Sequence, residues 1–338
     1  MSLSNPAAAR RYEVADRPPI RVTDILLRWE TILVLLLIAV IIFNASISPY
    51  FLDFYNLSDA TFNFSEKAIL ALAMAFLIIV REIDLSIAAI IALASLAMGL
   101  AAQAGAPTLA LIGLGLGVGV LCGACNGALV THFALPSIVV TIGTMSLFRG
   151  IAQVILGDQA LTKYPPSFQA IGQGYILERL PIPISFVVFL LLATVFGIVL
   201  HRTTIGRRLY AIGLNPTAAL FSGIRVNRIR FWLFVLMGLL AGLAAVLLTG
   251  RIGSTRPNIA LGFELEVVTM VVLGGVSIAG GAGGIVGVVL AVFVLGLTTF
   301  GLSLINVPGI VISILNGVLL IVSIAAPALA TRLLRRKT

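Results

Sequence analysis

Ionisable side chains stand beside long apolar runs at a few places in this sequence, and the densest group is REIDLS at residues 81–86. Within it Arg81, Glu82, Asp84 and Ser86 separate two apolar runs. Charged groups at membrane depth carry protons or ions, or line the route of a polar solute. The group also fits a short turn in which Asp84 caps the following helix, with Ser86 nearby. Asp84 and Ser86 are therefore candidates for a translocation pathway, and both interpretations stay open.

Further polar residues in or beside apolar runs could bind a solute. Arg149, inside TMSLFRGIAQ, could donate hydrogen bonds to a sugar or a carboxylate, or it could snorkel to the interface or pair with an acid. Glu264, two residues before Glu266, opens an apolar run, where a carboxylate also favours a helix N-terminus. The uncharged Asn126, Gln153, Asn258 and Asn316 could bind polyol hydroxyls, or could join neighbouring helices. We include Arg149, Glu264, Asn126 and Asn316 in the predicted pathway.

The cysteines and histidines do not form a catalytic or metal-binding set. Cys122 and Cys125 share one face of a predicted helix, but no His or acidic residue lies close enough in sequence to complete a zinc site. Cysteine otherwise behaves as a small apolar residue, so we interpret both as packing residues. His132 and His201 are isolated from each other and from the cysteines. We predict no catalytic residue, metal or cofactor in this chain.

The lysines exclude nucleotide binding by a phosphate loop. The three lysines follow Glu66, Thr162 and Arg336. The chain therefore has no Gly-Lys dipeptide, which the phosphate-binding loop requires. If ATP drives this protein, a separate partner subunit must bind the ATP and its magnesium.

The composition is that of a membrane protein. Of 338 residues, 60% are hydrophobic and 10% are charged, with a mean hydropathy of +1.14, whereas soluble domains carry about 25% charged residues. The net charge of +9 does not indicate nucleic-acid binding, because the basic residues lie in short segments between apolar runs. That arrangement is a signal of membrane topology.

We predict an all-α polytopic membrane protein with about ten transmembrane helices, because a spanning helix needs about 20 mainly apolar residues. The candidate runs are roughly 30–48, 67–80, 83–103, 107–131, 136–157, 182–200, 231–249, 264–278, 284–305 and 308–326. The second and eighth are short. With the N-terminus in the cytoplasm, 16 of the 22 basic residues fall in inner segments and five outside. This bias fits the positive-inside rule and places both termini in the cytoplasm.

The predicted organisation has no soluble domain. A cytoplasmic tail (1–29) precedes a transmembrane permease domain (30–326), and a basic cytoplasmic tail (327–338) follows it. The largest inner loop spans about 201–230. The outer loop 158–181 is rich in proline and glycine, so we expect a structured cap or a short re-entrant piece.

Two glycine patterns predict opposite structures. Glycines recur every fourth residue at 115, 119, 123 and 127, which is a stripe of small residues that allows close helix contact in lipid. The segment GGVSIAGGAGGIVG at 274–287 holds seven glycines in fourteen residues. Glycine disfavours a continuous helix, so we expect a broken span or a tight inner turn there.

The inner loop contains GRRLYAIGLNPTAALFSGI at residues 206–224, an amphipathic segment interrupted by glycine. Such a segment suits docking into a groove of a partner. It resembles the cytoplasmic loop of the ribose-type permeases of bacterial ATP-binding-cassette importers. The resemblance implies that the loop docks on an ATPase subunit. The docking residues it implies are Gly206, Arg207, Ala211, Gly213, Asn215, Ala218, Ala219 and Gly223.

Three other stretches resemble the same family in the same order, so the likeness covers nearly all of the chain beyond residue 30. They are IDLSIAAIIAL at 83–93, NGALVTHFALPSIVVTIGTMSLFRGI at 126–151 and GFELEVVTMVVLGGVSIAGGAGGIVG at 262–287. One departure is clear: the family has Gly-Gly before Ile-Asp-Leu-Ser, and this chain has Arg81-Glu82.

The resemblance implies a multi-pass permease subunit of the bacterial inner membrane that moves a rhamnose-, ribose- or autoinducer-2-like monosaccharide by alternating access. It implies three partners: an ATPase subunit, a periplasmic sugar-binding protein, and a second copy or a sister permease. The alternative from the residues alone is a self-contained secondary transporter driven by an ion gradient, with Asp84, Glu82 or Arg149 as coupling groups.

Overall fold

The computed structural model describes residues 28–177 and 180–335 as a bundle of helices with one small hairpin. The helices are α2 (Trp29–Ile47), α3 (Phe54–Ile79), α4 (Ile87–Gln103), α5 (Thr108–His132), α6 (Ser137–Leu156), α7 (Pro166–Gln173), α8 (Ile184–Arg202), α9 (Thr204–Leu214), α10 (Pro216–Phe221), α11 (Val226–Ile252), α12 (Phe263–Leu273), α13 (Ile285–Leu304) and α14 (Gly309–Arg335). Strands β1 (Tyr175–Leu177) and β2 (Leu180–Pro183) pair antiparallel. The predicted tail residues 1–27 and 336–338 lie outside the described residues.

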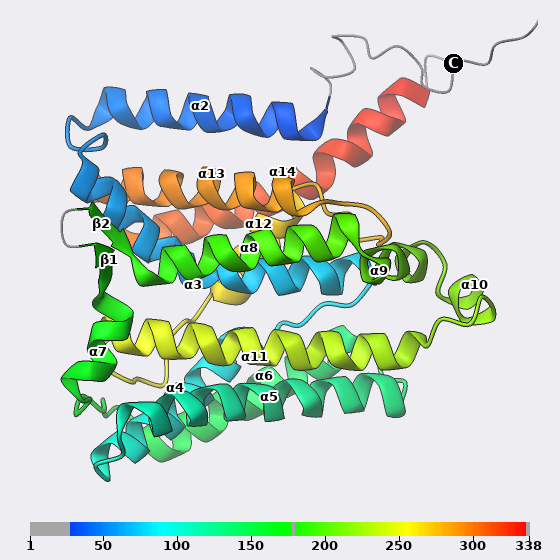
Figure 1. Ribbon diagram of the computed structural model, residues 1–338. Helices are drawn as coiled ribbons and strands as arrows, with labels where there is room; N and C mark the ends of the chain where they lie inside the picture. Colours follow the sequence, from blue (N-terminus) through cyan, green and yellow to red (C-terminus); the bar gives the residue numbers. More distant parts are fainter. Residues whose placement is uncertain (1–27, 178–179, 336–338) are drawn as a thin grey trace, which may run out of the picture.

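The long helices lie side by side, from α2 at one edge through α13, α3 and α11 to α5 at the other (Figure 1). One end of the bundle carries α7, β1 and β2, and we call it the α7 end. The opposite end carries α9 and α10, and we call it the α9 end. The charge bias of the sequence predicts that the α9 end faces the cytoplasm.

Each of the ten predicted runs coincides with a helix, but only seven described helices are long and apolar enough to span a membrane: α2, α3, α5, α6, α8, α11 and α13. The shorter apolar helices are α4 and the Gly309–Ser323 part of α14. Helix α12 has only 11 residues, which gives about 16 Å at 1.5 Å per residue, half of a bilayer core. The all-α polytopic class is confirmed, whereas the count of ten and the inward orientation of both termini stay predictions.

Helix α3 is much longer than the predicted run 67–80 because its polar first half is also helical. Asp53 caps it, and its Oδ1 accepts hydrogen bonds from the backbone N–H groups of Tyr55 (3.0 Å) and Asn56 (3.2 Å). The helix contacts α8, α11, α12 and α13, and most of its apolar span is buried. It is the central helix of the bundle.

The predicted glycine stripe on α5 is a packing surface. Its members are all buried: Gly115, Gly119, Gly123 and Gly127. A Cβ atom added to Gly119 would lie 2.2 Å from the carbonyl oxygen of Gly238 on α11, and one added to Gly123 would lie 2.3 Å from that of Phe234. The backbones of α5 and α11 therefore touch directly, as small residues permit.

The glycine-rich segment breaks the chain between α12 and α13, as predicted. Residues 274–284 contain no helix, and we call them the glycine turn. Gly280 and Gly281 have φ angles of 82° and 73°, a conformation that glycine adopts without a Cβ penalty. The predicted span 264–278 consequently ends at Leu273.

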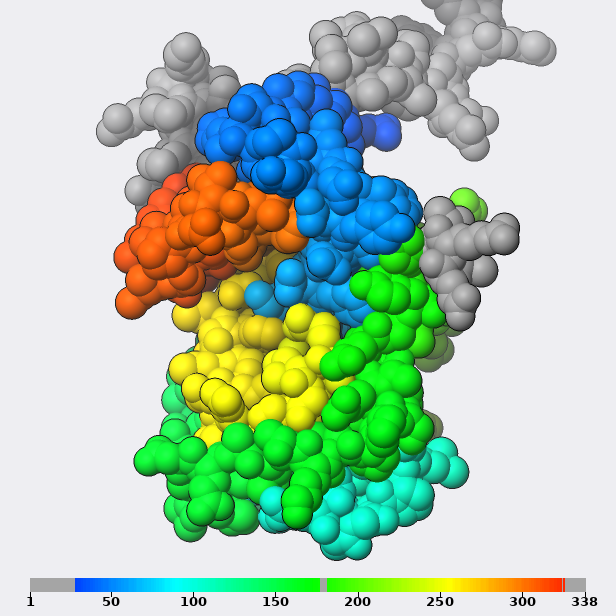
Figure 2. Space-filling view, turned by 90° about the vertical axis from the view of Figure 1, so that its left-hand side faces the viewer, coloured from blue at the N-terminus to red at the C-terminus, as the bar shows by residue number. Residues whose placement is uncertain are grey.

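The predicted outer loop forms a cap at the α7 end. Figure 2 shows this end of the molecule, where the segment around residues 250–260 lies between the segment around 160–180 and the first part of α3. Gly172 of α7 fits against the backbone of Gly250 and Arg251, with no space for a Cβ. The cap therefore holds the end of α11 in place.

Candidate functional site

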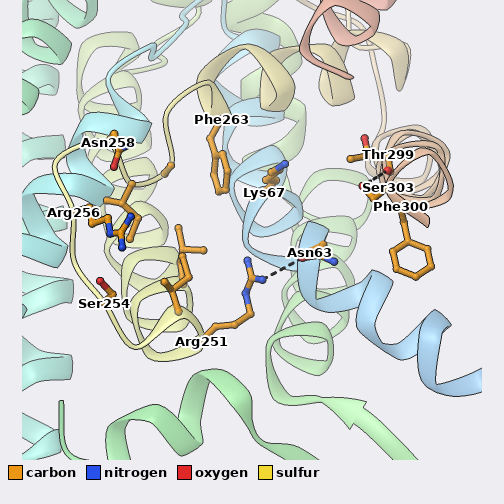
Figure 3. Close-up of a pocket in the computed structure, with 14 residues that line it drawn as sticks. Asn63, Lys67, Arg251, Ser254, Arg256, Asn258, Phe263, Thr299, Phe300 and Ser303 are labelled. Atoms are coloured by element: carbon orange, nitrogen blue, oxygen red, sulfur yellow. Dashed lines mark hydrogen bonds between the residues drawn. The ribbon is translucent and has the colours of Figure 1, made fainter. Parts of the chain in front are cut away.

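A cavity of about 460 Å³ opens at the α7 end among α3, α11, α12 and α13 (Figure 3). Its polar lining is Asn63, Lys67, Arg251, Ser254, Arg256, Asn258, Thr299 and Ser303, and its apolar lining includes Phe263 and Phe300. This size and this mixture of aromatic faces and hydrogen-bonding groups suit a small organic solute.

Two of the cations in this cavity are neutralised by ion pairs with α3 or α12. Lys67 Nζ lies 2.6 Å from Glu266 Oε2 and 4.6 Å from the ring centroid of Phe263. Arg251 Nε lies 2.8 Å from Oε1 of Glu66, whose side chain is only 1% exposed. Arg251 also donates to Asn63 Oδ1 (3.2 Å; Figure 3). These pairs fix the cavity wall and reduce its positive charge.

The connection between α11 and α12, residues 253–262, begins with residues that alternate between the cavity and the protein interior and ends with three successive lining residues, Asn258, Ile259 and Ala260. Ser254, Arg256 and Asn258 line it, whereas the buried Thr255 between them is fixed from behind. Thr255 exchanges backbone hydrogen bonds with Leu161 (2.9 and 3.0 Å), and its Oγ1 lies 2.5 Å from the hydroxyls of Ser95 and Tyr164. The chain pairs with Leu161 like a strand at Thr255, and an extended chain directs successive side chains to opposite sides, so Ser254 and Arg256 face the cavity while Thr255 faces away from it.

Arg256 and Asn258 also line a second cavity of about 650 Å³, together with Gln153, Asp158 and Gln159. Both side chains are exposed. Within the described part of the chain, neither side chain has a recorded hydrogen bond or ion pair. Their donors and acceptors are thus available to a solute at either cavity.

Arg149 holds the same connection in place. Its Nη1 atom donates hydrogen bonds to the carbonyl oxygens of Pro257 and Ile259, both at 2.7 Å. Glu264, at the start of α12, interacts with this guanidinium electrostatically, and its Oε2 is buried without a hydrogen-bond partner among the described residues. Arg149 therefore acts through the connection, and its role in the pathway stays a prediction.

Three predicted pathway residues, Asp84, Ser86 and Asn126, form one fully buried polar cluster. Asp84 Oδ1 accepts hydrogen bonds from the backbone N–H of Ser86 (2.9 Å) and from its hydroxyl (2.6 Å). Asn126 Nδ2 donates to Ser86 Oγ (2.8 Å) and to Asp84 Oδ2 (3.4 Å). Among the residues that the structure describes, Asp84 thus hydrogen-bonds only to neutral partners, and it lies at the N-terminus of α4, where a carboxylate is favourable.

Asn316 lies apart from that cluster. It is buried on α14, a helix that contacts α12 and α13. Its Oδ1 has no hydrogen-bond partner within the described ranges. The structure therefore does not bring the six predicted pathway residues into one site.

The predicted docking segment forms α9 and α10 at the other end of the bundle. Asn215 caps α10, and its Oδ1 accepts from the N–H groups of Thr217 and Ala218, both at 3.0 Å. Of the predicted docking residues, Arg207, Asn215, Ala218 and Gly223 are exposed, Ala211 is half-buried, and Gly206, Gly213 and Ala219 are buried. The buried residues can position the segment but cannot contact a partner directly.

The outward face of this segment is more apolar than the predicted residues suggested. Leu214, Leu220 and Phe221 are 67%, 59% and 87% exposed. The sequence does not distinguish them, because apolar residues are ordinary in a membrane protein. Their position in two short helices beyond the bundle distinguishes them, together with the basic residues Arg207 and Arg208.

Of the polar lining of the cavity, sequence reasoning identified only Asn258 as a possible solute ligand. Lys67, Arg251 and Arg256 are among the five basic residues outside the inner segments, where the sequence shows them only as charges that bear on topology, and Asn63 carries no sequence signal. The available signal was the pair Glu66-Lys67 beside an apolar run, since buried charges require partners. No group of three or more His, Cys, Asp or Glu side chains suited to a metal occurs among the residues that the structure describes. Cys122 is buried and Cys125 is exposed.

A bundle of apolar helices with a polar cavity at one end and amphipathic helices at the other has the architecture of a membrane transport subunit. Residues 56–324 match the family described as the permease component of the branched-chain amino acid transport system, and the chain belongs to this family. It is thus a multi-pass permease of the bacterial inner membrane, as predicted.

Comparison with characterised proteins agrees with the predicted importer class. The chain is 36% identical over 300 residues to the autoinducer 2 import system permease protein LsrD of Escherichia coli K12, covering 87% of this chain and 90% of that protein. The LsrD protein of Shigella flexneri gives the same values, and that of E. coli SMS-3-5 is 35% identical. No solved structure matches the chain significantly.

Proposed function

We propose that this chain forms the translocation path of an ATP-driven importer for a small sugar-like molecule, which enters from the α7 end. The single observation that carries the substrate class is the state of charge in the 460 Å³ cavity. Lys67 and Arg251 are paired with carboxylates, and the remaining lining offers amide, hydroxyl and guanidinium groups beside phenyl rings. Such groups hydrogen-bond the hydroxyl groups of a neutral solute, and Arg256 is the one lining cation for which no carboxylate partner occurs among the described residues.

The relatives support this substrate class, since LsrD is the permease of an autoinducer 2 import system. We include rhamnose- and ribose-like monosaccharides with autoinducer-2-like molecules, because all are small and rich in hydroxyl groups. A periplasmic binding protein would deliver the solute to the α7 end. A second copy of the chain or a sister permease would complete the pore.

The motor is proposed to be a separate ATPase subunit that docks on α9 and α10. The exposed Leu214, Leu220 and Phe221 provide the apolar anchors, and Arg207 and Arg208 surround them with positive charge. ATP binding by the partner would move α9 and switch the access of the path between the two sides of the membrane, a rigid-body transition biased by a ligand.

A reconstituted system tests the proposal. The chain is purified in mild detergent with its bound partners, which are identified by mass spectrometry, and it is then placed in liposomes with the ATPase and the binding protein. We expect an ATPase to copurify with the chain. We also expect uptake of a labelled monosaccharide that requires ATP on the side of the liposome membrane where the ATPase is bound. Uptake by the chain alone, driven by a proton gradient, would instead establish the ion-coupled alternative, in which the buried Asp84 is the coupling group.

A further inference from the structure

Arg81 has a backbone conformation that is uncommon for its residue type. Its φ angle is 67°, in the left-handed region that favours glycine and disfavours side chains with a Cβ atom. It lies in the connection between α3 and α4, residues 80–86, which we call the α3–α4 turn. A strained residue persists when the contacts of its side chain compensate for the conformation.

The side chain of Arg81 binds the end of α9. Nε donates to the carbonyl oxygen of Gly213 (2.6 Å) and Nη2 to that of Leu214 (2.8 Å). These are the last two residues of α9, where carbonyl groups lack partners within the helix. The positive charge also complements the negative end of the helix dipole. The guanidinium therefore acts as a two-pronged cap on α9.

The backbone of α9 packs directly against the end of α3 and the glycine turn, with no free space at Gly213. A Cβ atom on Gly213 would lie 1.9 Å from the carbonyl oxygen of Ile79 and 2.4 Å from the backbone nitrogen of Gly281. Gly281 donates from its N–H to that Ile79 oxygen (2.9 Å), and the Tyr210 hydroxyl donates to the carbonyl of Gly283 (2.6 Å). Helix α9, the end of α3 and the glycine turn consequently form one tightly packed joint.

The residues that follow Arg81 connect this joint to the interior. Glu82 Oε1 lies 3.1 Å from Arg230 Nε on α11. The N–H of Ile83 donates to the hydroxyl of Ser137 at the start of α6 (3.3 Å). Asp84 is the centre of the buried cluster with Ser86 and Asn126. Four successive residues thus join α9 to α11, α6 and α5.

We propose that Arg81 is a positioning residue that transmits movement of α9 to the buried Asp84 cluster through the α3–α4 turn. The inference rests on the proposed function of α9 as part of the ATPase-docking segment. At a position whose left-handed φ angle favours glycine, Arg81 instead provides a two-hydrogen-bond link between the docking segment and the turn.

The first test measures the link in the full chain without any partner. Arg81→Gly keeps the backbone conformation accessible and removes the guanidinium, whereas Arg81→Lys keeps the charge but not the fork of donors. We expect hydrogen exchange of the amides at the end of α9 to rise about tenfold in Arg81→Gly, because hydrogen bonds to a charged group are lost. The rise should be smaller in Arg81→Lys. The control is Arg202→Gln, at the exposed end of α8.

The second test measures transmission in the assembled transporter. We expect Arg81→Gly to retain the copurifying ATPase and its basal hydrolysis, and to lose stimulation by the loaded binding protein by about tenfold, the equivalent of one charged hydrogen bond. Unchanged hydrogen exchange would show that Arg81 does not hold α9. Raised hydrogen exchange together with normal stimulation of ATP hydrolysis would show that Arg81 does not transmit movement of α9 to the Asp84 cluster. If the wild-type chain binds no ATPase at all, the proposed function fails and the transmission role fails with it, while the exchange result still reports on the link itself.

Discussion

Arg251 at the end of α11 lies 2.8 Å from Glu66 in the middle of the central helix α3, and this carboxylate is almost completely buried. The pair joins the wall of the polar cavity to the core of the bundle. An unpaired carboxylate in that position would cost far more than an exposed one, because its hydration is lost.

Removal of one partner of this pair should therefore destabilise the fold more than removal of both. We expect Arg251→Gln to lower the free energy of unfolding by about 3 kcal/mol. The double variant Glu66→Gln with Arg251→Gln should recover most of that loss, since no buried charge remains. Thermal unfolding of the four combinations in detergent gives the coupling free energy. Equal losses in the single and double variants would show that packing, and not charge, holds this contact.

Asn258 should contribute to solute binding at the cavity. Asn258→Ala removes a side-chain amide that forms no hydrogen bond with any described residue, so the fold should keep its stability. We expect the apparent KM for uptake to rise about tenfold, the equivalent of roughly 1.4 kcal/mol. Gln103→Ala is a suitable control, because Gln103 is exposed at the end of α4 and lines neither cavity. A rise in KM of the same size in this control would argue against a binding role for Asn258.

Two substitutions of Asp84 distinguish a structural role of the buried cluster from a role in ion coupling. Asp84→Ala leaves the donors of Ser86 and Asn126 without their acceptor, and it should cost about 2 kcal/mol of stability. Asp84→Asn should cost much less, because an amide oxygen can accept from Ser86 and the free Asn126 Oδ1 can accept from the new amide. For an ATP-driven importer, Asp84→Asn should also retain ATP-dependent uptake. Loss of uptake in this well-folded variant would favour ion coupling.

The contact between α5 and α11 offers a matched pair of glycine substitutions on one helix. A Cβ atom at Gly119 would lie 2.2 Å from the Gly238 carbonyl oxygen, whereas one at Gly117 meets no atom within 4 Å. We expect Gly119→Ala to destabilise the protein by about 2 kcal/mol through forced backbone separation. Gly117→Ala should be neutral or slightly stabilising, since alanine favours helix. Melting temperatures that fall equally for both would contradict the direct backbone contact.

The docking segment should respond to substitution on its exposed face. Phe221→Asp places a charge where an 87% exposed ring is available to a partner, and we expect recovery of the ATPase subunit to fall about tenfold or more. Ala218→Glu should act in the same direction, whereas Gly213→Pro should also disturb the fold because Gly213 is packed against Ile79 and Gly281. Quantitative mass spectrometry of copurified protein measures the loss, and an unchanged melting temperature of Phe221→Asp confirms that the chain remains folded.

Local signals in the sequence determined the membrane class, the helical runs, the broken span and the α5 glycine stripe. These features depend on composition and short-range spacing: apolar length predicts a span, glycine content breaks a helix, and a four-residue repeat places small residues on one face. Sequence likeness determined the family. Asp84, Ser86 and Asn126 were each identified as polar residues at membrane depth before the fold showed that they touch.

The tertiary structure alone decided which charges are paired and which polar groups are free. Glu66 and Arg251 are separated by 185 residues, and no local pattern links them. Arg149 binds backbone carbonyl oxygens, and Arg81 caps a helix that lies 132 positions away. Because the acceptors in both contacts are backbone atoms, the side chains of the partner residues give no signal in the sequence. Helix α3 extends beyond its apolar run because its polar half finds partners on other helices. Such pairings depend on the relative positions of distant helices, and these are fixed only when the whole bundle packs.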